Sequence, residues 1–182
     1  QYNQISSLNM TDNSVLRSLN CRDNPLTHLN VQNNTMLDSL VSFFTQLTTL
    51  DVSNNAALSH LMLAGNPLTT LDINANPDLI DLNCNGCLLN SINITNVESL
   101  TALVLGNNKL TNIDVSDHMF LETFYCNGNP LTNLNLSNNT ALNNLHCGWT
   151  NLTTLNLSNN LALSRLNVDN TDISTLDLSN ND

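Results

Sequence analysis

Cysteine and histidine are the residue types in this 182-residue chain that could bind a metal or act in catalysis. Cys84 and Cys87 form a C-N-G-C motif, the spacing of a redox pair or of half a zinc site. A zinc site needs a second pair of ligands at similar spacing, and the sequence has none. The four histidines stand at unrelated positions, and no nucleophile–base set or paired carboxylates can be placed around them. We therefore expect no catalysis, no metal site and no cofactor.

These residues lie in an internal repeat that must position them. An aliphatic residue followed by an L-T-T-L-like segment recurs every 21 residues without an insertion, at Ile5, Leu26, Leu47, Leu68, Leu89, Leu110, Leu131, Leu152 and Ile173. Eight full units starting at Ile5 and a partial unit, 173–182, cover nearly the whole chain. The repeat therefore predicts a single solenoid domain over residues 1–182. Because the sequence stops within a unit, we also expect it to be a fragment of a longer protein.

Each unit holds two apolar triplets of the form L-x-x-L-x-L, for example at 47–52 and 58–63. In both, the last two apolar residues alternate with a polar one, which is typical of a strand with one buried face. Turn-forming residues follow, Ser-Asn-Asn at 53–55 and Gly-Asn-Pro at 65–67. The pattern predicts a β-rich solenoid of short parallel strands stacked in register, with little or no helix.

The second triplet and the residues after it give L-x-x-L-x-L-x-x-N-x-L at 58–68, and again at 100–110 and 121–131. This motif resembles the leucine-rich repeat, in its bacterial, often secreted class of 21-residue units that alternate LTxLDLSNN with LxxLxCxxN. The resemblance implies a noncatalytic module that is secreted or displayed at the cell surface. It also implies that the strands of the second triplet line the face that binds ligands. It does not indicate which ligand.

Four cysteines occupy one repeat position, the third apolar slot of the second triplet: Cys21, Cys84, Cys126 and Cys147. We expect them to be small buried hydrophobes with free thiols. Cys87 instead replaces an asparagine that recurs at Asn24, Asn66, Asn108 and Asn129. We expect these asparagines to point inward and to hydrogen-bond the backbone of the turns as a ladder.

Two sets of outward positions are candidate surfaces. The constant set follows the first triplet's opening residue and is mostly threonine: Thr27, Thr48, Thr69, Thr111, Thr132 and Thr153. Repeated turn chemistry explains its constancy. An alternative function is binding of ice or another crystalline surface, although ice-binding solenoids usually carry two threonines flanking an inward residue, and that pattern is missing.

The variable set surrounds the second triplet and carries large apolar and aromatic residues at nominally exposed positions: Val41, Phe43, Phe44, Met62, Val104, Tyr125, His146 and Trp149. Tyr125, His146 and Trp149 are predicted to form one aromatic patch, and the phenylalanines with Met62 a second. One of the two phenylalanines could instead fill its turn. These residues predict protein or glycan contacts, and adhesion, with aromatic anchors supplying the affinity.

The charge balance excludes several partners. Four basic residues against fifteen acidic ones give a formal net charge of −11, whereas nucleic-acid binding requires a basic surface. No apolar run is long enough to span a bilayer, so we expect no membrane insertion. Two further expectations concern the context of the array: end-to-end self-association, and a passive role as spacer in a longer adhesin.

Overall fold

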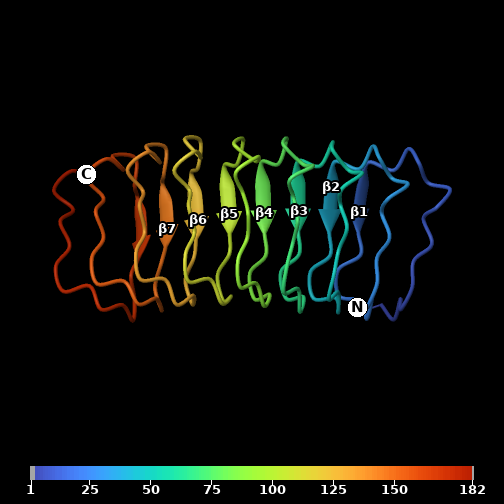
Figure 1. The fold of residues 1–182 in the computed structure, drawn as a ribbon, viewed down its shortest axis with the longest axis horizontal. Helices are drawn as coiled ribbons and strands as arrows, with labels where there is room; N and C mark the ends of the chain where they lie inside the picture. The colour runs from blue at the N-terminus through green and yellow to red at the C-terminus, as the bar shows by residue number, and fades with distance from the viewer. Residues whose placement is uncertain (1–2, 182) are drawn as a thin grey trace.

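The computed structural model describes residues 3–181 as a right-to-left stack of coils with one parallel β-sheet along its length (Figure 1). The sheet has eight strands of three residues each, paired in chain order. Their bounds are β1 (Ser18–Asn20), β2 (Ser39–Val41), β3 (His60–Met62), β4 (Asp81–Asn83), β5 (Ala102–Val104), β6 (Thr123–Tyr125), β7 (Asn144–His146) and β8 (Arg165–Asn167). Each residue lies opposite the residue 21 positions later, as Leu40 lies opposite Leu61. The predicted parallel solenoid is confirmed.

The core runs continuously through the inside of the coils. The middle residue of a strand points inward and its two neighbours point outward, so β3 buries Leu61 completely while His60 and Met62 stay partly exposed. Leu58 and Leu63 of the same triplet are also buried, and so are the corresponding residues of the other units except Leu16 and Val168 near the two ends, which are partly buried. One coil cannot bury its apolar edge alone, so the stability of each unit depends on its neighbours.

The first triplet does not form a strand, and that part of the prediction is wrong. Within residues 3–181, all strands come from the second triplet. Where the residue before the opening leucine is not proline, neighbouring units share one backbone hydrogen bond here, such as Leu88 N–H to Leu68 O at 2.9 Å, rather than a ladder. The polar residue before the last apolar residue begins a turn, as Asp51 Oδ1 accepts the N–H of Ser53 at 3.0 Å. Asn83 of β4 makes the same bond with Asn85, so this turn does not by itself prevent a strand.

This turn is the same in every unit, since an Asp or Asn oxygen accepts the N–H two residues later. In the units where this turn residue is an aspartate, its hydrogen bonds depend on the protonation of the carboxyl group. Hydrogen bonds from the Ser53 hydroxyl and N–H lower the pKa of Asp51, and those from the Ser116 N–H and hydroxyl lower the pKa of Asp114. Bonds from the Ser179 N–H and hydroxyl lower the pKa of Asp177 in the same way.

We expect these turns to make the fold less stable in acid. A carboxyl whose folded-state pKa lies below its unfolded value, about 3.9 for Asp, stabilises the fold above that pH. The stabilisation is lost as the pH falls through the lowered pKa. Melting temperatures measured from pH 7 to pH 3 test this. The triple variant Asp51→Asn, Asp114→Asn, Asp177→Asn should lose less stability between pH 5 and pH 3, because Asn keeps the turn, as at Asn135. Equal acid loss in both proteins would contradict the assignment.

Candidate binding site

The outward residues of the strands form a shallow face whose composition varies along the solenoid. In register, Val41 of β2 lies beside Met62 of β3, and Val104 of β5 lies beside Tyr125 of β6. Asn83 separates these two groups. All four apolar or aromatic side chains are partly exposed, although they flank buried residues. We call this surface, with His146, the strand face.

The most ordered part of the strand face is a stacked ring pair. The rings of Tyr125 and His146, which are register partners on β6 and β7, lie 4.2 Å apart with an interplanar angle of 13°. Asn144 Nδ2 donates a hydrogen bond to Tyr125 Oη at 2.7 Å, which fixes the phenol from the neighbouring strand. The result is a rigid aromatic surface that is in place before any ligand arrives.

The residue three positions after each strand has a left-handed backbone. At most positions it is a residue type that accepts positive φ: Asp23, Gly65, Gly86, Asn107, Gly128 and Asn170. Two units instead place Phe44 (φ 50°) and Trp149 (φ 55°) there. For bulky residues this conformation costs on the order of 1–2 kcal/mol. Their side chains are nevertheless 65% and 66% exposed, so neither gains much burial in return.

The two phenylalanines of the second unit lie at this turn and not in the core. Their ring centroids are 6.4 Å apart, with Phe43 partly exposed and Phe44 largely exposed. The Phe44 ring rests on the backbone of the next unit at Gly65, where its Cδ1 and Cε1 leave no room for a Cβ. The residue that fills the turn is Thr45, which is buried and bonded to Asn66.

The predicted patch of Tyr125, His146 and Trp149 divides into two features. The first two stack, as described, whereas Trp149 lies beyond the strand on the turn, and no ring contact joins it to the pair in the described part of the chain. The sequence reasoning overlooked the positive φ at Phe44 and Trp149. The Gly, Asn and Asp residues that fill the same repeat position elsewhere are the signal that could have revealed it.

His60 lies in a short polar chain on the strand face. Its Nε2 is 3.1 Å from Asp81 Oδ2, and its Nδ1 is 2.7 Å from Ser59 Oγ. Ser59 Oγ also lies 3.2 Å from the carbonyl oxygen of Asp38. The contacts resemble a serine–histidine–aspartate series in composition, but none of the grooves described below includes Ser59. We assign it no chemistry.

The cysteines are buried free thiols, as predicted. Burial raises the pKa of Cys147 to about 12 and that of Cys126 well above its ordinary value, so both thiols stay protonated. A hydrogen bond with Cys87, together with burial, raises the pKa of Cys84. Over residues 3–181 no three His, Cys, Asp or Glu side chains gather as metal ligands.

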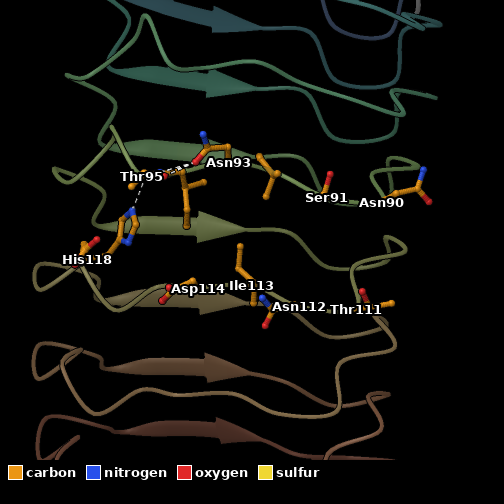
Figure 2. A pocket seen from close by; sticks show the side chains of 12 residues that line it. Asn90, Ser91, Asn93, Thr95, Thr111, Asn112, Ile113, Asp114 and His118 are labelled. Atoms are coloured by element: carbon orange, nitrogen blue, oxygen red, sulfur yellow. Dashed lines mark hydrogen bonds between the residues drawn. The ribbon is translucent and has the colours of Figure 1, made fainter.

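The constant threonines are all exposed, but their face is grooved. Figure 2 shows one groove, of about 270 Å³, between the first-triplet segments of two units, with Asn90 and Thr111 toward one end and His118 at the other. Similar grooves recur between other units, for example beside Thr49 and Asp72. Binding of ice or another surface through Thr27, Thr48, Thr69, Thr111, Thr132 and Thr153 stays a prediction.

His118 departs from the repeat at this groove. It is buried where other units have an inward asparagine, and its Nε2 lies 3.2 Å from Ile94 O. Its Nδ1 has no hydrogen-bond partner in the described chain. The ring therefore substitutes for one of the asparagine's two donor contacts.

We also find, among the described residues, no helix long and apolar enough to cross a bilayer.

No protein-family model matches the sequence, and no curated protein sequence matches it. Solved structures do. The functional domain of InlJ from Listeria monocytogenes, described as including a cysteine ladder, is 26% identical with a TM-score of 0.65; the alignment covers 98% of this chain and 49% of that one. An internalin (inlF) from Listeria monocytogenes is 19% identical with a TM-score of 0.88, over 94% and 54%.

A third similar structure is YopM, a leucine-rich effector protein from Yersinia pestis, at 24% identity and a TM-score of 0.67, over 75% of this chain and 39% of that one. The chain thus spans about half the length, or less, of these three proteins. The 21-residue motif, the in-register parallel strands and these neighbours agree with one another. The chain has the leucine-rich-repeat fold of these bacterial proteins, a parallel β-solenoid whose turns are 21 residues long.

Proposed function

We propose that the chain is a noncatalytic protein-binding module and that the strand face is its contact surface. The observation that carries the proposal is the stacked pair Tyr125–His146, an aromatic surface fixed by Asn144 and open on one side. Aromatic residues held rigidly at partly exposed positions lose little conformational entropy on binding and are favoured as interface anchors. Val104 extends this surface by one strand, and Val41 with Met62 forms a second apolar area beyond Asn83.

The cellular location of this module is part of the proposal. The resemblance of the repeat to an often secreted bacterial class supports a location outside the cell or at its surface, with adhesion as the biological use. Binding of a glycan through the same aromatic rings is the alternative to binding of a protein. The strongly acidic composition supports a partner that is not itself highly acidic.

Selection from a displayed random-peptide library on the immobilised chain, with a glycan array beside it, tests the proposal. We expect peptides whose affinity falls about tenfold or more in the variant Tyr125→Ala, His146→Ala, because anchor residues contribute about 2 kcal/mol or more. The matched control is Thr111→Ala, Thr132→Ala on the opposite face, which should bind normally. Peptides that bind the Tyr125→Ala, His146→Ala variant with unchanged affinity would refute the strand face as the contact surface. Glycans that bind this variant but not the parent chain would refute it as well.

A further inference from the structure

The left-handed turn positions form a continuous edge beside the strand face, which we call the turn ledge: Phe44, Gly65, Gly86, Asn107, Gly128 and Trp149. An aromatic side chain stands at each end, five units apart. At a strand spacing of about 4.8 Å this separates the two rings by about 24 Å. Between them the ledge carries three glycines and one asparagine; the Phe44 ring lies on Gly65 and the Asn107 side chain lies against Gly128, so the bare backbone is at Gly86.

The backbone of the ledge is bonded on one side only. Its N–H groups donate to the next unit, as Gly86 N–H does to Gly106 O at 2.9 Å and Gly128 N–H to Gly148 O at 2.9 Å. The carbonyl oxygens of Gly65, Gly86 and Gly128 accept no hydrogen bond from the described residues. Of these glycines, Gly86 is exposed, so its carbonyl oxygen is the acceptor that the floor offers to a ligand that brings donors.

Both aromatic ends of the ledge have a carboxylate in the adjoining unit. Asp23 N–H is bonded to Phe43 O, which places Asp23 beside Phe44, and its only basic contact is a 3.7 Å pair with the exposed Arg22. At the other end, Trp149 N–H is bonded to the main-chain oxygen of Asp169 at 2.6 Å, and the Asp169 carboxylate accepts the side-chain amide of Asn167 at 2.9 Å. An aromatic ring with a carboxylate in the adjoining unit attracts a guanidinium or ammonium group.

The middle of the ledge has the opposite charge. Lys109 follows Asn107 by two residues in the same turn and is exposed. A cation above this turn would meet a like charge, whereas hydroxyl and amide groups would not. The ledge thus favours positive charge at its two ends and none between them.

We propose that the turn ledge binds an extended peptide segment with two basic side chains six or eight residues apart and an uncharged middle. An extended chain rises about 3.4 Å per residue and its side chains alternate between two faces, so only an even spacing turns both basic side chains to the ledge. Spans of about 20 Å and about 27 Å, for six and eight steps, bracket the separation of Phe44 and Trp149. One basic side chain lies against Phe44 and Asp23, and the other against Trp149 and Asp169. This proposal goes beyond the proposed function, because the turn ledge is a surface separate from the strand face.

Trp149 is the only tryptophan of the chain, so its fluorescence reports directly on one end of the ledge. The probe is a synthetic peptide with arginine at both ends and five or seven serine and threonine residues between them, so that both arginines lie on one face of the extended chain. We expect a saturable change in Trp149 fluorescence at low salt. A peptide of equal charge with its two arginines adjacent should bind about two- to fivefold more weakly, since it gains one aromatic contact instead of two. A glutamate-ended peptide should give no change.

Variants of the ledge aromatics separate binding from folding. Phe44→Gly should weaken the spaced peptide about two- to fivefold, and Trp149→Gly should do the same when the peptide itself carries the fluorophore. Both variants should unfold at the same or higher urea concentration than the parent, because glycine accepts the left-handed backbone. The matched control Asn107→Gly, at the same repeat position, should leave affinity unchanged.

Several experimental outcomes would refute the proposal that the turn ledge binds this peptide. One is equal affinity for the spaced and adjacent arginine peptides; another is unchanged affinity in Phe44→Gly. A fluorescence change produced by a neutral oligosaccharide or by anionic lipid vesicles, without one from the peptide, would assign the site to a different ligand class. The strand face is tested with a different variant, Tyr125→Ala, His146→Ala, which leaves the ledge intact. The ledge proposal can therefore be refuted while the proposed function stands, and the proposed function can be refuted while the ledge proposal stands.

Discussion

Replacing Phe124 with alanine is expected to destabilise the solenoid by about 3–5 kcal/mol, which would move the midpoint of urea unfolding to a much lower concentration. Phe124 is the middle residue of β6 and is fully buried, with Leu103 and Leu145 opposite it on the neighbouring strands. The coils on both sides are shaped around a ring at this level. Truncation removes its apolar area from the core and leaves a cavity that the two flanking leucine side chains cannot fill.

Leucine at the same position is the matched control, because the corresponding residue is leucine in the other seven strands. Phe124→Leu is expected to cost less than about 1.5 kcal/mol. The comparison is made by urea unfolding followed by far-ultraviolet circular dichroism. A loss for Phe124→Ala no larger than that for Phe124→Leu would show that the coils around β6 collapse to fill the space. The core would then be far more plastic than its complete burial implies.

The difference between the two halves of a unit marks the limit of the sequence reasoning about the fold. Both triplets share the same apolar alternation, and alternation reports only which side chains are buried, not whether the backbones of neighbouring coils come close enough to pair. Leu61 and Leu82 are opposed in a ladder, whereas the first triplets pair no strands within residues 3–181. The polar residue before the last apolar one does not distinguish them either, because Asn83 of β4 makes the same turn bond as Asp51.

The site was predictable as a set of residues but not as a geometry. A fixed 21-residue period places Tyr125 beside His146, and their stacking follows from the parallel register. The bond from Asn144 to Tyr125 Oη depends on a side-chain rotamer, and the period carries no information about it. Trp149 shares the unit of His146, which suggested a common patch. The left-handed turn between them instead directs Trp149 to the edge.

The inward asparagines were predicted as one ladder, and the structure has two. The first is the expected one, with Asn66 and its equivalents. The second, unforeseen, contains Asn55, whose Nδ2 donates to Val31 O and Asn34 O in the preceding unit while its Oδ1 has no partner. Asparagine is so frequent in this sequence that its composition does not separate buried members from exposed ones. The two ladders differ in how many backbone groups each asparagine side chain hydrogen-bonds.

Removing Asn66 is therefore expected to be costly, with Asn66→Ala destabilising the solenoid by about 3 kcal/mol or more. Its Nδ2 donates to Ser42 O at 2.6 Å and Leu63 O at 2.8 Å. Its Oδ1 accepts the buried N–H of Leu47 at 3.0 Å. Alanine leaves that N–H without an acceptor and both carbonyls without this donor in the core, and each unsatisfied buried group costs about 1–3 kcal/mol.

Two further variants separate the loss of hydrogen bonds from the change in side-chain size. Asn66→Thr copies Thr150, whose hydroxyl donates to the carbonyl three residues earlier at 2.7 Å, so it should recover part of the loss. Asn55→Val copies the buried Val97 in the second ladder and should cost only about 1 kcal/mol, because Val31 O and Asn34 O keep their backbone donors. Urea midpoints should then fall in the order parent, Asn55→Val, Asn66→Thr, Asn66→Ala. Equal losses for Asn55→Val and Asn66→Ala would mean that packing, and not the hydrogen bonds of the first ladder, holds neighbouring coils together at the turn.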